Sequence, residues 1–374
     1  MTPLRGLLWA FLPVFLLVDG GEVAARLHPP PDPRPPPAAG DRNAVAQILL
    51  RGDPWLLWEL LPGDHSEAGV DVHINAAGFR DKARGPKSRP RALSIGDSSI
   101  YGFGVPDDAV FTSVLETRFN AEFINGGVPG YSTYQSLNLL DIRGMALDPD
   151  LLIVGSLWSD DNFDSFVDKD LLSTYAGWQA SPQSRLRAVL AHSVLFRWFD
   201  YTLRVVPRSE TARKVGWALP SNPAPTGARR VAINDYAANL DAFCDRMEAR
   251  GGGVVFLMLP NREDVAPVQA AQGWAIYRQV MQETAARRHV PLVDGPAAYT
   301  ASGHSAAELF LDQMHPTVLG QKVLADAVDA TLTGAGWPQH PLTVSPAASP
   351  LPTYSDPLDG SAGRPVPRST WPTP

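Results

Sequence analysis

Short apolar runs alternate with longer segments of helical periodicity between residues 91 and 335. Each apolar run is bounded by Gly, Pro, Asp or Asn, which is typical of a buried strand. The five runs are Ala92–Ile95, Glu122–Asn125, Leu151–Leu157, Val254–Leu259 and Val290–Val293. The helical segments are Val110–Asn120, Tyr134–Met145, Ala232–Arg250, Val265–Arg288 and Thr317–Leu332. This alternation predicts an α/β domain in which helices cover both faces of a five-stranded parallel sheet.

Three side chains suited to nucleophilic acyl transfer lie beside predicted strand or helix ends. Ser98 follows the first strand, and Asp312 and His315 stand three residues apart before the last helix, where Pro316 suits the first helical position. A hydroxyl, an imidazole that takes its proton and a carboxylate that orients the imidazole are the parts such chemistry needs. Gly-Asp-Ser is also a common turn, and the Asp-His pair also fits a helix cap with a surface histidine. Their combination favours catalysis.

Four short motifs occur in the order that defines the SGNH (GDSL) hydrolase family, which the chain resembles over residues 73–333. The motifs are Gly96–Ser98, Asn125–Ser132, Asp150–Asp160 and Asp312–His315. The resemblance implies a flavodoxin-like three-layer sandwich, the SGNH hydrolase fold. It also implies an oxyanion hole formed by the backbone N–H groups of Ser98 and Gly130 with a third donor. The family's third motif ends in Asn-Asp, whereas this chain has Ser159-Asp160. Ser159 is therefore the predicted third donor, with Asn162 as the alternative.

Several nearby residues have simpler interpretations. Ser99 is expected to cap the helix that follows Ser98, and His304 is a rival for the base in a Ser-Gly-His-Ser loop. Gly126 and Gly127 fit a turn that needs positive φ. Cys244 lies in an apolar helical pattern and is expected to be buried.

The chain ends differ from the middle in composition. Arg5 precedes Gly6–Val18, a run without charge that suits a signal-peptide core better than a span of about 18 or more residues. An uncleaved membrane anchor is the alternative, so we expect an extracytoplasmic protein, periplasmic or secreted, with possible membrane association. The predicted segments are a signal peptide or anchor (1–28), a Pro-rich stalk (29–42), an N-terminal adjunct (43–90), the hydrolase domain (91–335) and a disordered Pro-rich tail (336–374).

A helical insertion is predicted at residues 163–230, directly after the third motif. We favour an extra packing layer over a lid that contacts substrate. Its aromatic residues are Phe163, Phe166, Tyr175, Trp178, Phe196, Trp198, Phe199, Tyr201 and Trp217.

Composition excludes some functions. A net charge of −7 argues against nucleic-acid binding, and the basic stretch from Arg80 to Arg91 is expected to be a solvated loop. A single cysteine excludes internal disulfides and cysteine metal clusters, and no motif calls for a metal or cofactor.

The expected function is a serine esterase that removes short acyl groups, such as acetyl, from a carbohydrate or lipid. The alternatives are an O-acyltransferase acting on an exported polysaccharide and a catalytically weak acyl-carbohydrate binding protein. The sequence leaves the oligomeric state open.

Overall fold

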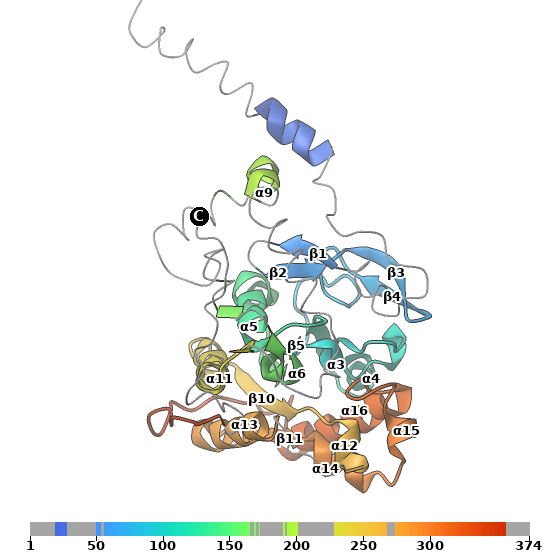
Figure 1. Ribbon diagram of the computed structural model, residues 1–374, viewed down its shortest axis with the longest axis vertical. Coiled ribbons are helices and arrows are strands. Elements are labelled where there is room, and N and C mark those ends of the chain that lie inside the picture. Colours follow the sequence, from blue (N-terminus) through green and yellow to red (C-terminus); the bar gives the residue numbers. More distant parts are fainter. Residues whose placement is uncertain are drawn as a thin grey trace, which may run out of the picture.

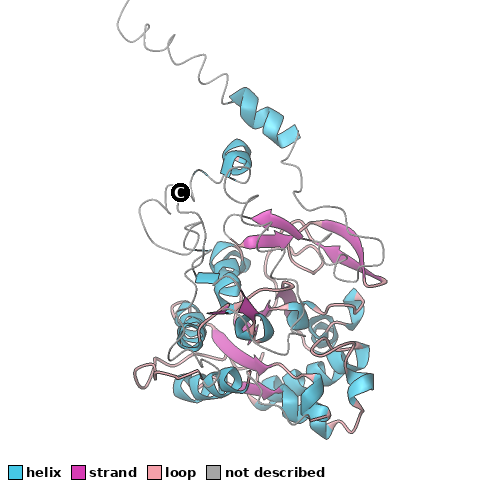
Figure 2. Ribbon diagram, in the orientation of Figure 1, coloured by secondary structure: helices cyan, strands magenta, loops and turns pink. Residues whose placement is uncertain are grey.

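The computed structural model describes residues 19–27, 50–53, 56–164, 168–169, 172, 190, 193–200, 228–267 and 274–356. At its centre lies a five-stranded parallel sheet (Figures 1 and 2). In spatial order the strands are β6 (Glu122–Gly127), β5 (Arg91–Gly96), β7 (Leu151–Gly155), β10 (Gly253–Met258) and β11 (Leu292–Asp294). Counted along the chain this order is 2-1-3-4-5, the flavodoxin-like order of doubly wound folds. The predicted five-stranded parallel sheet is confirmed.

Helices cover the sheet in two groups. One group, whose members pack against one another, comprises α5 (Thr133–Ile142), α11 (Ile233–Glu248) and α13 (Ala275–Arg288). The other comprises α4 (Phe111–Arg118), α14 (Gly295–Ala301) and α16 (Val318–Gly334). All residues of β5, β6, β7 and β10 are buried, as expected for parallel strands that helices cover on both faces. The shorter elements are α3 (Ser98–Tyr101), α6 (Trp158–Asp161), α12 (Arg262–Val265), α15 (Ala306–Leu309), η1 (Asp107–Ala109) and η2 (Gly144–Leu147).

Two helix predictions need correction. The helix predicted over 265–288 is shorter in the structure, where α13 begins at Ala275. Val265 is the last residue of α12, which Asn261 caps, and Pro267 disfavours helical backbone at the residue before it. The last helix begins at Val318 with Thr317 as its N-cap. Pro316 therefore precedes the helix, and it pairs instead with Phe310 in an isolated antiparallel bridge.

The N-terminal segment forms two antiparallel hairpins beside the main sheet (Figure 1). They consist of β1 (Leu50–Asp53) with β2 (Leu57–Leu60), and β3 (Gly63–Glu67) with β4 (Val70–Ile74). The indole of Trp58 donates a hydrogen bond to the carbonyl of Pro129 at 3.0 Å, and the Tyr131 hydroxyl donates to the Trp58 carbonyl at 2.5 Å. The hairpin thus packs on the loop that contains the second motif.

The basic stretch after these hairpins is a loop with exposed residues such as Lys82, as the sequence suggested, but several of its arginines are less solvated than expected. The Arg80 and Arg91 side chains are buried, and Arg91 forms a 2.5 Å ion pair with Glu122. Arg84 bonds Asp81 and Glu116 with little exposure. Carboxylates pair with these charges, and Glu116 and Glu122 come from about 30 residues further along the chain. This pairing explains the burial of the arginines.

Residues 336–356 lie against the domain without forming a helix or strand. The ring of Trp337 packs against that of Phe123 with centroids 5.6 Å apart, and Asp356 bonds the guanidinium of Arg229 at 3.0 Å. This differs from the prediction of a disordered tail from residue 336. Residues 357–374 lie outside the described part of the chain.

Much of the predicted insertion also lies outside the described residues, including Phe166, Tyr175, Trp178, Tyr201 and Trp217. Its described parts are a two-stranded antiparallel pair, β8 (Phe163–Asp164) with β9 (Ala228–Arg229), and helix α9 (Val194–Asp200). Glu22, in a helix formed by residues 19–27, accepts hydrogen bonds from the backbone N–H groups of Val194 and Leu195 at 2.9 and 2.8 Å. Figure 1 shows these two helices side by side, away from the sheet.

The predicted targeting run, residues 6–18, and the stalk likewise fall outside the described ranges. Within those ranges, no helix has the length and apolar character needed to span a bilayer.

Candidate active site

Ser98 lies at the carboxyl end of β5, beside the point where the strand order reverses. It is the first residue of α3, whose N-cap is Asp97. The first N–H groups of a helix have no acceptor within the helix, so the Ser98 amide lies where it can meet a developing negative charge. This is where doubly wound sheets bind ligands.

His315 and Asp312 reach the same point from the loop before α16. His315 Nε2 lies 2.7 Å from the Ser98 hydroxyl oxygen, and His315 Nδ1 lies 2.6 Å from a carboxylate oxygen of Asp312. When Nδ1 carries the proton toward Asp312, Nε2 can accept the serine proton. The structure therefore brings together the three predicted residues in one uninterrupted chain of hydrogen bonds.

Asp312 is held in its ionised form. Burial of its carboxyl would raise the pKa, but hydrogen bonds from the His315 ring and from the backbone N–H groups of His315 and Met314 outweigh that effect and hold the pKa at about 2. Both backbone bonds are 2.9 Å long. The Phe103 ring packs on the imidazole with centroids 4.7 Å apart, which restricts the orientation of the base.

Asp97 connects the first and third motifs, a role that sequence reasoning missed. Its buried carboxylate accepts hydrogen bonds from the backbone N–H of Ser99 at 2.9 Å and of Trp158 at 3.2 Å. Burial raises the pKa of Asp97 to about 6, although these hydrogen bonds act in the opposite direction. Asp97 thus fixes the turn that presents Ser98, and it is the helix cap that was predicted for Ser99.

Gly130, the second predicted oxyanion donor, has a φ of 79°, which favours glycine. Its carbonyl accepts a 2.9 Å hydrogen bond from Arg230, a buried residue paired with Asp168 at 2.8 Å. The Gly130 N–H shares its peptide plane with the Pro129 carbonyl, which accepts the hydrogen bond from the Trp58 indole. The bond from Arg230 fixes the next peptide plane, on the other side of the Gly130 α-carbon. Arg230 ends the predicted insertion, and the sequence offered no signal for this contact.

Gly126 and Gly127 belong to strand β6 and are not the positive-φ turn residues of the prediction. A Cβ on Gly127 would lie 2.2 Å from the backbone nitrogen of Tyr101. Glycine is therefore required there by the close approach of α3 to β6.

The third oxyanion donor stays a prediction. Ser159 is a buried residue of α6, and Asn162 follows the helix end. Neither side chain makes a hydrogen bond within the part of the chain that the structure describes. Next to Ser159, the buried carboxylate of Asp160 accepts from the backbone N–H of Thr133 at 2.9 Å and from its hydroxyl at 2.6 Å, so it anchors the start of α5.

Ser99 and His304, which the sequence also offered near the triad, have other partners. The Ser99 hydroxyl donates to the carbonyl of Met314 at 3.3 Å and so contacts the loop that carries His315. His304 has a half-exposed ring whose Nδ1 lies 3.9 Å from Glu308, and no described contact connects it with Ser98.

Arg80 holds the far end of α3. Its guanidinium donates to the carbonyls of Tyr101 at 3.1 Å and Gly102 at 2.7 Å, and also to that of Val105. It forms a 2.8 Å ion pair with Asp107, while its side chain is only 1% exposed. The adjunct thereby supports the short helix that carries the nucleophile.

The described residues contain no group of three or more His, Cys, Asp or Glu side chains arranged to hold a metal ion. Cys244 is buried, as expected, and burial raises the pKa of its thiol to about 12.

No family model matches the chain, and no curated protein matches it. Among solved structures, the chain is similar to an alpha/beta hydrolase enzyme from the metagenome of Lake Arreo, Spain (17% identity, 67% of this chain and 98% of that chain, TM-score 0.43). It is also similar to an acetylxylan esterase from Geobacillus stearothermophilus (15% identity, 66% of this chain and 95% of that chain, TM-score 0.42). A third similar structure is a putative lipolytic protein of the G-D-S-L family from Desulfitobacterium hafniense (13% identity, 65% of this chain and 99% of that chain, TM-score 0.41).

Proposed function

We propose that this chain is a serine ester hydrolase that removes short acyl groups from a carbohydrate or lipid ester. The supporting observation is the chain of contacts from the Ser98 hydroxyl through His315 to Asp312, with separations of 2.7 and 2.6 Å. Both distances are in the range of good hydrogen bonds. An ionised Asp312 at one end and a serine at the other is the arrangement that acyl transfer requires.

In the proposed reaction, the Ser98 oxygen attacks the ester carbonyl while its proton passes to His315 Nε2. Asp312 stabilises the resulting imidazolium through Nδ1. The proton then goes to the leaving alcohol, and water repeats the sequence on the acyl-enzyme to release the acid and free serine.

The negative oxygen of the tetrahedral intermediate would be held by the backbone N–H groups of Ser98 and Gly130. Each such donor is worth roughly 3–4 kcal/mol of barrier lowering. Ser159, or Asn162 in its place, would supply a third. Asp97 and Arg230 act on this hole indirectly, since Asp97 caps α3 and Arg230 bonds the Gly130 carbonyl.

We further propose an extracytoplasmic location, supported by the uncharged Gly6–Val18 run and the proline-rich segment after it.

An O-acyltransferase would use the same serine with a sugar in place of water. Incubation of the purified protein with 4-nitrophenyl acetate, with and without an acceptor sugar, separates these reactions. Free acetate in both cases supports the hydrolase. If acetylated sugar were the main product, the O-acyltransferase would replace the hydrolase as the assigned function. If the ester were not turned over at all, both assignments would be rejected.

A further inference from the structure

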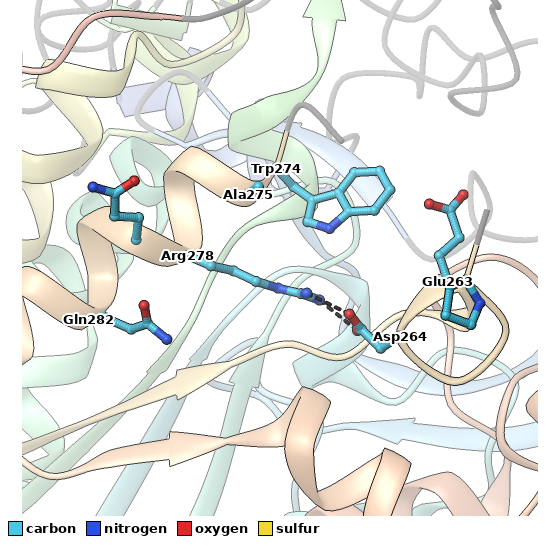
Figure 3. A pocket seen from close by; sticks show the side chains of 8 residues that line it. Glu263, Asp264, Trp274, Ala275, Arg278 and Gln282 are labelled. Atoms are coloured by element: carbon cyan, nitrogen blue, oxygen red, sulfur yellow. Dashed lines mark hydrogen bonds and ion pairs between the residues drawn. The ribbon is translucent and has the colours of Figure 1, made fainter. Parts of the chain in front are cut away.

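The catalytic loop, residues 310–317, carries the triad carboxylate and imidazole and is held on one side by α12. The Gln313 amide donates a hydrogen bond to Glu263 of α12 at 2.6 Å. Helix α12 is tied in turn to α13, because Arg278 donates two hydrogen bonds to Asp264 at 2.7 and 2.8 Å (Figure 3). These contacts fix the loop relative to α13. They do not involve α3, the helix of the proposed nucleophile.

Gln321 connects the other end of the catalytic loop to α3. Its side chain is 0% exposed, and its backbone N–H donates to the Thr317 carbonyl at 2.8 Å in the first turn of α16. The amide Nε2 donates to the Ser99 carbonyl at 3.3 Å, and the amide oxygen accepts from the backbone N–H of Phe111 at 3.0 Å. Because one partner accepts and the other donates, both halves of the amide are used. One side chain thus joins α16 to α3 and to the start of α4.

The turn of α16 from which Gln321 extends is closely packed. A Cβ on Gly320 would lie 2.4 Å from the carbonyl oxygen of Leu309, so only glycine permits this approach of α16 to α15. The Tyr299 hydroxyl donates to the Gly320 carbonyl at 2.6 Å, and the Thr317 hydroxyl accepts from the Gly320 N–H at 3.1 Å. These contacts hold the backbone that carries the Gln321 side chain.

Ser99 is joined to this region through two of its groups. Its carbonyl accepts from Gln321, and its hydroxyl donates to the Met314 carbonyl at 3.3 Å. The hydroxyl can rotate toward another acceptor, whereas the direction of a helical carbonyl is set by the backbone. Since α3 has only four residues, a shift of the Ser99 carbonyl would also move Ser98. A displacement of about 1 Å at a reacting group can lower a rate about 10²-fold.

We propose that Gln321 is a positioning residue that sets the separation between the Ser98 hydroxyl and the His315 imidazole. The inference rests on the proposed esterase function and adds a residue to it. Loss of the Gln321 amide should slow proton transfer from Ser98. Substrate binding should change little, and the pair of His315 with Asp312 should persist, because both of its members belong to the catalytic loop.

The first test is Gln321→Met, which keeps the length of the side chain and removes both hydrogen bonds. With 4-nitrophenyl acetate, kcat per folded molecule should fall about 10- to 100-fold while KM stays within about twofold of the native value. The downfield proton resonance of His315 Nδ1–H, bonded to Asp312, should remain. Val328→Ala is the control, since this buried residue further along α16 should lower Tm without lowering kcat.

Two results would overturn the inference and leave the esterase proposal intact. One is a native kcat per folded molecule in Gln321→Met, and the other is a loss of kcat accompanied by loss of the His315 resonance, which would indicate general disruption of the loop. If the native protein itself did not hydrolyse the ester, the proposed function and the inference would both be rejected.

Gln321→Glu is the second variant, and it serves even where Gln321→Met does not fold. It keeps an oxygen for the Phe111 N–H, but its carboxyl group can donate to the Ser99 carbonyl only while protonated. Burial raises the pKa of such a carboxyl group toward neutral pH. The ratio of its kcat per folded molecule to the native kcat at the same pH should therefore fall between about pH 6 and about pH 9. A ratio that did not change with pH would show that this donor is not needed and would overturn the inference.

Discussion

Among single residues, the Ser98 hydroxyl decides whether the proposed chemistry exists. Its oxygen lies 2.7 Å from His315 Nε2, whereas the neighbouring Ser99 hydroxyl makes only a 3.3 Å contact with a carbonyl. Ser98→Ala should abolish 4-nitrophenyl acetate hydrolysis with little change in Tm, and His315→Ala should lower kcat by several orders of magnitude. Ser99→Ala is the matched control and should keep most of the activity. If Ser99 were essential and Ser98 dispensable, the nucleophile would be assigned one residue too early.

The ionisation of Asp312 gives a pH dependence with a definite sign. Because its folded-state pKa is about 2, below the ordinary value of 3.8, its contribution to stability is fully present above pH 3.8 and is lost as the pH falls through about 2. The Tm of Asp312→Asn should therefore lie below that of the native protein at neutral pH, and the two should converge toward pH 2. Thermal unfolding from pH 7 to pH 2 measures this. A constant difference would show that Asp312 is not stabilised as a carboxylate.

Ser159 tests the place where the third motif departs from the family pattern. If its hydroxyl faces the oxyanion, Ser159→Ala should lower the acylation rate constant by about 10²-fold or more, with little change in binding, because that bond strengthens as charge develops. Stopped-flow measurement of 4-nitrophenol release resolves this step. Asn162→Ala is the matched control. If only Asn162→Ala slowed acylation, the third oxyanion donor would be Asn162. If neither variant slowed it, the oxyanion hole would consist of backbone N–H groups only.

At the scale of elements, the sheet and the three triad residues are predictable because their signals are local. A buried strand needs an apolar run, and the Ser98, Asp312 and His315 motifs span a few residues each. The hydrogen bonds that hold the site in place join residues far apart in the sequence. Arg80 bonds carbonyls more than 20 residues away, and Arg230 bonds a carbonyl 100 residues away. A sequence pattern cannot distinguish such an arginine from a solvated one, which is why the burial of Arg80 and Arg91 in the predicted loop was not foreseen.

Arg80 shows how the adjunct acts on helix α3. Removing its guanidinium would leave the carbonyls of Tyr101, Gly102 and Val105 without that donor, at a cost of at least about 3 kcal/mol. We expect Arg80→Met to lower the free energy of unfolding and also kcat for 4-nitrophenyl acetate, because α3 carries Ser98. Arg80→Lys should restore part of both, since an ammonium can reach fewer carbonyls. An unchanged kcat per folded molecule would limit Arg80 to a structural role.

For the whole molecule, residues 336–356 run from one end of the parallel sheet toward the other. The triad lies at the carboxyl ends of the strands, and Asp356 reaches this end by bonding Arg229, which donates to the Asp161 carbonyl at 3.0 Å. The first part of the segment packs at the amino ends. There Trp337 is 2% exposed beside Phe123 of β6, and Leu342 contacts Gly253, the first residue of β10. This segment reads as a proline-rich tail in the sequence because it gains its order from tertiary contacts and not from helix or strand periodicity.

Two truncations test what residues 336–356 contribute to stability and to activity. Ending the chain after residue 335 should remove the Trp337 packing, a loss of about 3–5 kcal/mol by analogy with large-to-small substitutions, and should leave the buried Arg229 guanidinium without its bond to Asp356. Ending it after residue 356 retains both contacts, so its Tm should match that of the full chain. Because no contact in the described part of the chain joins residues 336–356 directly to Ser98, Asp312 or His315, kcat/KM per folded molecule should be similar in all three proteins at low temperature. Denaturant unfolding and active-site titration measure the two quantities. Equal stability of both truncations would show that residues 336–356 contribute nothing to the fold, and a selective loss of kcat/KM after truncation at 335 would connect the tail to the catalytic end.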